Sequence, residues 1–149
     1  MKHKLIAVIG AADASAEDLK TAEELGRQIA LRGWTLITGG LSGVMEAASK
    51  GASEAGGTVV GILPHADAAH ANPHVGIPIA TNMGHARNMV IVHSASAVIA
   101  VGGSYGTLSE IAVALKLDKP VFVLNSWDID GTESVENAEA AIEACENLL

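Results

Sequence analysis

A glycine-rich turn between a buried strand and a helix is the part of this sequence best suited to chemistry. The apolar run Ala97–Val101 is followed by Gly102, Gly103 and Gly106, and a helical pattern begins at Thr107. Strand, turn and helix in this order leave backbone N–H groups unpaired at a helix N-terminus, where the helix dipole favours an anion. Glycines let a phosphate approach the backbone because they carry no Cβ. Taken alone, the turn predicts equally well a phosphate site and a tight connection whose glycines serve packing.

A second turn of the same kind favours the phosphate site. Gly39, Gly40, Ser42 and Gly43 follow the expected strand Thr35–Thr38 and open another helical pattern. Neither turn has the spacing of a dinucleotide fingerprint, and no Gly-Lys-Ser/Thr segment is present, so ATP hydrolysis of the P-loop type is not expected. With residues at the ends of neighbouring strands, the predicted ligand contacts are Gly10, Ala11, Gly39, Gly40, Ser42, Gly43, Thr81, Arg87, Asn88, Gly102, Gly103, Ser104, Tyr105, Gly106 and Thr107.

Arg87 and Glu110 are isolated charges in an otherwise uncharged central region. Arg87 is the only lysine or arginine between Lys50 and Lys116, and Glu110 is the only carboxylate between residues 67 and 118. A cation in the first turn of a helix opposes the helix dipole, so Arg87 needs another role. It is predicted to form an ion pair with Glu110, a bidentate bond to a phosphate or carboxylate, or both.

Two roles are open for Glu110. It follows Thr107 by three residues, which is the spacing of a capping box and predicts a helix over 107–117 that begins at Thr107. Thr107 then either caps this helix or donates its hydroxyl to a phosphate. As a catalytic group, the Glu110 carboxylate could hold a ribose hydroxyl or assist the departure of a base.

Histidines are concentrated in one region, but their pattern does not indicate a metal site. Five of the six lie between residues 65 and 93, at irregular spacing and without a cysteine. Loop and surface histidines are therefore favoured over a zinc site, and no metal is predicted. No Gly-x-Ser-x-Gly segment is present, so a Ser-His-Asp hydrolase is not supported.

The elements that must position these residues alternate between strand and helix. Strands are predicted at 5–9, 35–38, 58–63, 77–80, 97–101 and 121–124, and helices at 16–32, 44–55, 84–94, 107–117 and 133–149. This order predicts an α/β fold, a doubly wound, Rossmann-like parallel sheet with helices on both faces and the first strand central. The whole chain, 1–149, is expected to form one nucleotide- or phosphate-binding domain. In such sheets ligands bind beyond the carboxyl ends of the strands, where the two glycine-rich turns lie.

Composition limits the partners and the compartment. The chain has 149 residues and a net charge of −8, which argues against a nucleic-acid surface. No apolar run is long enough to span a membrane, and the N-terminus lacks the features of a signal peptide, so a cytoplasmic protein is expected. The single cysteine, Cys145, excludes an internal disulfide and is expected to lie buried in the last helix.

Two segments resemble the LOG family, often misnamed lysine decarboxylases, and the wider SLOG superfamily. That family pairs Met-His-x-Arg-Lys with Pro-Gly-Gly-x-Gly-Thr-x-x-Glu, and residues 84–88 and 102–110 match these motifs without a gap. The matching residues include Arg87, Gly103, Gly106, Thr107 and Glu110. The departures are Gly84 for Met, Asn88 for Lys, Gly102 for Pro and Ser104 for the second Gly. With the segments 38–47 and 81–88, these departures look most like the short subfamily that contains molybdenum cofactor carrier proteins.

The resemblance implies two functions that use the same phosphate-binding turns. LOG enzymes are phosphoribohydrolases that cleave nucleoside 5′-monophosphates to the base and ribose 5-phosphate, and their catalytic arginine and glutamate match Arg87 and Glu110. The carrier subfamily binds the molybdenum cofactor, an anionic pterin with a phosphate, as ligand. The loss of the family's lysine, which is Asn88 here, favours binding over catalysis. A nucleotide-sensing module is a third possibility.

Assembly is the last expectation. The helices at 87–94 and 107–117 carry more apolar residues than one sheet face can cover. They are therefore predicted to meet their symmetry mates in a homodimer or homotetramer, and the resemblance implies the same.

Overall fold

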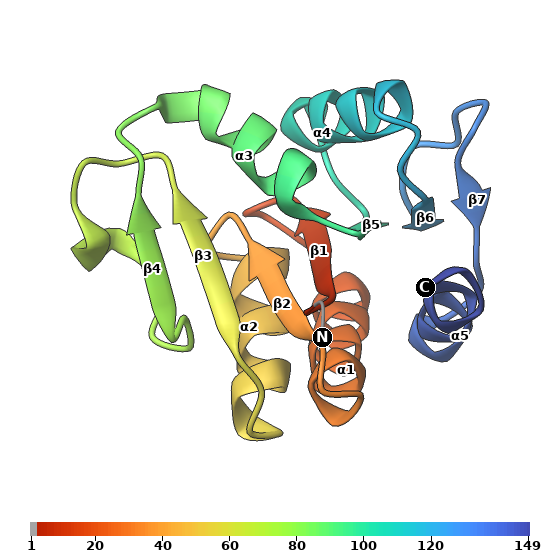
Figure 1. Cartoon of the computed structure of the whole chain (residues 1–149), viewed down its shortest axis with the longest axis horizontal. Coiled ribbons are helices and arrows are strands. Elements are labelled where there is room, and N and C mark those ends of the chain that lie inside the picture. The colour runs from red at the N-terminus through yellow and green to blue at the C-terminus, as the bar shows by residue number, and fades with distance from the viewer. Residues whose placement is uncertain (1–2) are drawn as a thin grey trace.

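A single parallel sheet of seven strands organises the molecule (Figure 1). The computed structural model describes residues 3–149, and its strands are ordered β4-β3-β2-β1-β5-β6-β7, so the prediction of a central first strand is confirmed. The strands are β1 (Leu5–Gly10), β2 (Thr35–Thr38), β3 (Val59–Leu63), β4 (Ile77–Ala80), β5 (Ala97–Val101), β6 (Val121–Leu124) and β7 (Glu133–Ser134). Strand order reverses between β1 and β5, and this point is where such sheets bind ligands.

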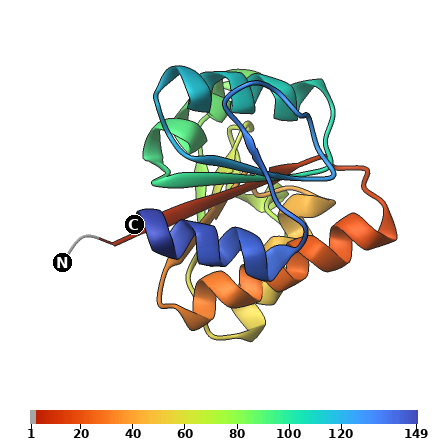
Figure 2. The same cartoon turned by 90° about the vertical axis from the view of Figure 1, so that its right-hand side faces the viewer.

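Helices cover both faces of the sheet, which confirms the doubly wound fold (Figure 2). One face carries α1 (Ala16–Leu31), α2 (Val44–Glu54) and α5 (Ala138–Leu148), and the other carries α3 (Arg87–Ser94) and α4 (Tyr105–Lys116). Two short 3-10 turns, η1 (Ala68–His70) and η2 (Gly84–Ala86), complete the described chain. None of the helices in this part of the chain is long and apolar enough to cross a membrane.

The buried strands have continuous apolar sequences because both of their faces pack against a hydrophobic core. All five residues of β5 are fully buried. Ala97, Ile99 and Val101 pack into the core beneath α1, α2 and α5, whereas Val98 and Ala100 pack into the core beneath α3 and α4. The strand that leads into the central glycine-rich turn is thus held rigidly from both sides.

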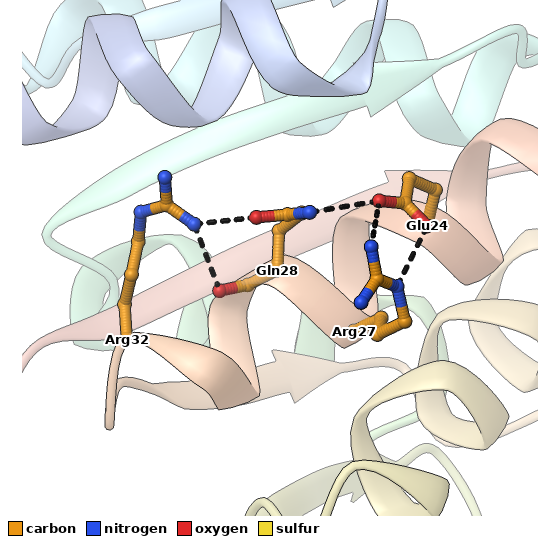
Figure 3. A network of polar contacts seen from close by, with 4 residues as sticks. All are labelled: Glu24, Arg27, Gln28 and Arg32. Atoms are coloured by element: carbon orange, nitrogen blue, oxygen red, sulfur yellow. Dashed lines mark hydrogen bonds and ion pairs between the residues drawn. The ribbon is translucent and has the colours of Figure 1, made fainter.

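The first helix begins and ends as its sequence indicates. The Ser15 side chain caps α1 by accepting a hydrogen bond from the Asp18 backbone N–H at 3.1 Å. Gly33 follows the last turn with a positive φ of 71°, which glycine adopts without strain. The outer face of α1 carries linked polar contacts, in which Gln28 joins the Glu24–Arg27 pair to Arg32 (Figure 3). Arg32 also pairs with Glu146 of α5 at 2.5 Å.

Three predicted helix boundaries are wrong. The last helix does not span 133–149, because Glu133–Ser134 forms the edge strand β7 and α5 begins only after Asn137, whose side chain accepts from the Ala140 N–H at 2.8 Å. So short and polar a strand has no hydrophobic period to reveal it. The helix expected over 84–94 is divided into η2 and α3, and α4 begins at Tyr105 rather than at Thr107.

Candidate functional site

The N-terminus of α4 carries backbone N–H groups without partners. The first intrahelical bond runs from the Leu108 N–H to the Ser104 carbonyl at 3.0 Å, so the N–H groups of Tyr105, Gly106 and Thr107 precede it. Within residues 3–149 no side chain caps this helix. Unpaired N–H groups of this kind form a favourable anion site, as the sequence predicts.

The predicted capping box is wrong. Ser104, not Thr107, occupies the N-cap position, and Thr107 and Glu110 lie inside the helix, where both are buried. Because the helix begins two residues early, Glu110 lies beyond the reach of a capping interaction. Helix capping therefore does not explain the presence of Glu110.

Residues that follow β6 hold the turn before α4 in place. The Gly102 N–H donates to the Leu124 carbonyl at 3.0 Å, and the Trp127 indole N–H donates to the Ser104 carbonyl at 3.1 Å. The Ser126 hydroxyl donates to the Gly102 carbonyl. Gly103 has a φ of 115°, a conformation that favours glycine. The loop after β6 thus fixes the direction in which the unpaired N–H groups point.

A pocket of about 220 Å³ lies at the carboxyl ends of β1 and β2, between the first turns of α3 and α4. It brings together nine of the residues that the sequence singles out: Gly10, Ala11, Gly39, Arg87, Asn88, Ser104, Gly106, Thr107 and Glu110. Four more lining residues were not predicted as contacts, namely Ile9, Ala12, Met45 and His85. Of these, only His85 carried a signal, because it lies two residues before Arg87 in the same segment.

The structure does not bring the remaining predicted contacts into the lining of this pocket. They are Gly40, Ser42, Gly43, Thr81, Gly102, Gly103 and Tyr105. Gly40 and Gly43 are explained by packing, since a Cβ at Gly40 would lie 2.7 Å from the Leu63 side chain and one at Gly43 would collide with the Ala11 and Ala12 carbonyls. Thr81 donates its hydroxyl to the Leu63 carbonyl at 2.7 Å.

The two glycine-rich turns therefore differ in what they offer a ligand. The Val44 N–H at the start of α2 donates to the Ala11 carbonyl at 3.1 Å, so one amide of that helix start is already used. From the second turn only Gly39 lines the pocket. At the start of α4, by contrast, none of the first three amides has a partner in the described chain.

Arg87 is buried, and three of its five N–H donors are bound within the described chain. Its Nε donates to the Ile62 carbonyl at 2.9 Å, one Nη donates to the Gly39 carbonyl at 3.5 Å, and the other donates to the Asn88 side chain. Gly39 makes this arrangement possible, since a Cβ there would lie 2.7 Å from Arg87 Nη2. Arg87 thus ties the ends of β2 and β3 to the start of α3.

The predicted ion pair between Arg87 and Glu110 is not formed. In the described part of the chain, the ion pairs join Arg27 with Glu24, Arg32 with Glu146 and Lys50 with Glu23. Arg87 and Glu110 nevertheless influence each other through space. Burial lowers the pKa of Arg87, and the negative charge of Glu110 opposes this shift.

Glu110 is a buried carboxyl group that can exchange a proton near neutral pH. Its exposed fraction is 8%, and its carboxylate receives no hydrogen bond from residues 3–149. Burial raises its pKa from an ordinary 4.5 to about 7, and the positive charge of Arg87 works against this rise. A perturbed carboxyl group in a pocket with unpaired N–H groups is typical of a functional site.

Other features of the molecule do not compete with this pocket. A larger hollow of about 780 Å³ is formed by α1, α2 and α5, but exposed side chains such as Lys20, Arg27 and Glu54 line it. Among the residues that the structure describes, no three His, Cys, Asp or Glu side chains gather as a metal site would need. The rings of His65 and His70 stack on each other, with centroids 3.9 Å apart.

Known proteins are similar to this chain in sequence and in fold. An uncharacterized protein of Archaeoglobus fulgidus is 49% identical over 97% of this chain and 96% of its own length. A cytokinin riboside 5′-monophosphate phosphoribohydrolase of Mycobacterium tuberculosis is 33% identical over 78% of this chain and 67% of its own length.

Two solved structures are closely similar. The molybdenum cofactor binding protein of Rippkaea orientalis superimposes with a TM-score of 0.95 at 40% identity, covering 99% of this chain and 98% of that one. The molybdenum cofactor carrier protein of Chlamydomonas reinhardtii superimposes with a TM-score of 0.89 at 40% identity, covering 97% and 98%. The sequence profile of the SLOG cluster4 family matches residues 3–148. The chain therefore belongs to the SLOG cluster4 family, within the superfamily that its two motifs indicated.

Proposed function

We propose that this protein binds an anionic ligand that carries a phosphate, and that the ligand is the molybdenum cofactor, held as cargo by a carrier. The observation that carries the proposal is the set of unpaired N–H groups at the start of α4, of which Gly106 and Thr107 line the pocket. They supply donors to a phosphate without requiring a lysine. The two similar structures, both named for molybdenum cofactor binding or carriage, support this choice of ligand.

The pocket fits the phosphate end of such a ligand. A Cβ at Gly106 would meet no atom within 4 Å, so open space lies directly beside the unpaired amides. Thr107 adds a hydroxyl there, and its side chain is 3% exposed. The volume of about 220 Å³ suits the phosphate rather than a whole pterin, which would extend through the mouth of the pocket.

Phosphoribohydrolase activity is the second candidate, and Glu110 favours it. A buried carboxyl group with a pKa of about 7 can give or take a proton as a glycosidic bond breaks. The Mycobacterium tuberculosis relative is named for this reaction. Against it, Asn88 replaces the lysine of the motif, and the similarity to the carrier structures covers nearly the whole of both chains.

One comparison separates the two candidates. The protein is incubated with AMP and with adenine-modified monophosphates, and free base and ribose 5-phosphate are assayed. In parallel it is loaded with molybdenum cofactor, passed through gel filtration and tested for the fluorescent oxidised pterin. We expect retained pterin and no turnover. Robust base release that disappears in Glu110→Gln would contradict the carrier function and establish phosphoribohydrolase activity.

We also propose that the protein works in the cytoplasm as a homodimer or homotetramer. The single cysteine, Cys145, is buried, as suits a reducing compartment. Apolar residues on the outer side of α3 and α4 support the assembly. Met89 is 40% exposed, and Val90 and Leu108 are partly exposed.

A further inference from the structure

The Glu110 side chain and the start of α4, where the anion is proposed to bind, line the same small pocket, whose volume is about 220 Å³. An ionised Glu110 places a negative charge beside the anion, and the exposed fraction of 8% leaves little water to screen it. A protonated Glu110 removes that charge and adds an O–H donor.

Arg87 forms no ion pair with Glu110 in the described chain, and its guanidinium is held in place. Its guanidinium donates to the Ile62 and Gly39 carbonyls and to Asn88, so turning toward a ligand would break bonds to buried acceptors. The ion pairs of the described chain do not include Glu110. The pocket therefore holds a fixed cation and a carboxyl group free to change its charge.

The other elements around Glu110 bring one more titratable group. The loop after β1 contributes Ala11 and Ala12 to the lining, and α2 contributes Met45, all uncharged. The turn before α3 contributes His85, which is exposed at the pocket. Histidine side chains gain positive charge as pH falls, so His85 is the group whose effect must be separated from that of Glu110.

We infer that an anion binds in this pocket together with a proton on Glu110, so that the site captures its ligand at lower pH and releases it as pH rises. This inference rests on the proposed anion-binding function and adds its regulation. Burial raises the pKa of Glu110 to about 7, which places the change within the physiological range. The coupling is reciprocal, so a bound anion must also favour the protonated form of Glu110.

Sulfate is the probe, because it stays fully ionised across the range and its own titration cannot imitate the effect. Its affinity is measured by calorimetry at about pH 6 and about pH 8 for wild type, Glu110→Gln and His85→Gln. For a proton site with a pKa of about 7, we expect wild type to bind about tenfold more weakly at the higher pH. Glu110→Gln, which mimics the protonated side chain, should lose this dependence, whereas His85→Gln should keep it.

Proton uptake is measured in the wild type as well, so that the test does not depend on how a variant folds. Binding in two buffers of different ionisation enthalpy reveals the protons taken up per sulfate, and uptake near neutral pH is expected. Equal affinity at both pH values, or a dependence lost only in His85→Gln, overturns the inference while leaving the anion site intact. Failure to bind sulfate at either pH contradicts the anion site itself, and the inference falls with it.

Discussion

Burial of the Glu110 carboxyl group gives the free energy of unfolding a pH dependence of its own. The folded-state pKa of about 7 exceeds the ordinary value of 4.5. Between these values the folded chain keeps a proton that the unfolded chain has released. The unfolded state thus binds fewer protons, and stability falls as pH rises. Most of the loss falls between about pH 5 and about pH 8 and amounts to about 2.5 kcal/mol.

Glu110→Gln should abolish this loss. The free energy of unfolding of the variant, relative to wild type, is expected to increase by about 2.5 kcal/mol between about pH 5 and about pH 8. Urea unfolding at both pH values measures the change, and Glu143→Gln, on the exposed side of α5, is the matched control. If the difference in the free energy of unfolding between variant and wild type stays constant with pH, Glu110 does not have a raised pKa in the folded state.

Gly106 offers the cleanest single test of the anion site. A Cβ there meets nothing within 4 Å of the folded chain, and its φ is not positive, so Gly106→Ala should fold and gain a little stability. The added methyl group enters the space beside the unpaired amides and should keep a phosphate at a distance. We expect sulfate affinity to fall by about ten- to a hundredfold.

Gly76→Ala is the control for that substitution. Its Cβ would lie 3.7 Å from the Val59 carbonyl, an ordinary contact, and Gly76 is outside the pocket lining. Calorimetric titration with sulfate should show unchanged affinity for this variant. If Gly106→Ala also binds as wild type does, the start of α4 is not the phosphate cradle.

At the scale of elements, the loop after β6 acts as a support for the start of α4. Trp127 bonds to the Ser104 carbonyl, and its ring centroid lies 6.2 Å from that of Tyr105. Tyr105 is 81% exposed, so the pair marks the outer side of the turn. A site made of backbone groups depends on such supports, because the donors cannot be oriented by their own side chains.

Trp127→Phe should therefore weaken ligand binding from outside the pocket. The variant keeps an aromatic ring but loses the bond to Ser104, and we expect sulfate affinity to fall by about three- to tenfold. Trp34→Phe, at the other tryptophan of the chain, is the control and should bind as wild type does. Trp34→Phe leaves Trp127 as the single tryptophan of the chain. The fluorescence of this control protein should therefore change as sulfate binds. Unaltered affinity in Trp127→Phe would show that the loop does not position the site.

For the whole molecule, the sequence was sufficient to predict the fold but only part of the site. The spacing of apolar residues and the alternation of strands with helices predicted the central β1 and the helices on both faces. These signals are clear because buried parallel strands are continuous apolar runs between strong turn residues. Non-local packing decided the rest. Whether Gly40 faces a ligand or Leu63, and whether Arg87 meets Glu110 or the Ile62 carbonyl, depends on segments distant in sequence. No local pattern reports those neighbours.

The outer side of α3 and α4 is the surface where we expect copies of this chain to meet. The two helices lie side by side on one face of the sheet (Figure 1). Their outward residues include Met89 and Ala112, which are exposed, and Val90 and Leu108, which are partly exposed. By contrast, the outer side of α1 carries the charged network of Figure 3. An apolar strip beside the start of α4 would bring two ligand pockets close to one interface.

Ala112→Glu tests this assembly with little risk to the fold. Ala112 is exposed in the middle of α4, and glutamate is a good helix former, so an isolated chain should tolerate the change. At an interface the same charge would be buried without a partner and would be strongly destabilising. Sedimentation velocity at micromolar concentration should show wild type as a dimer or tetramer and Ala112→Glu as a monomer. Ser53→Glu on α2 adds the same charge to the opposite face and should leave the assembly unchanged. A wild type that sediments only as a monomer would contradict the proposed assembly, and an Ala112→Glu protein that still assembles would place the interface on another surface.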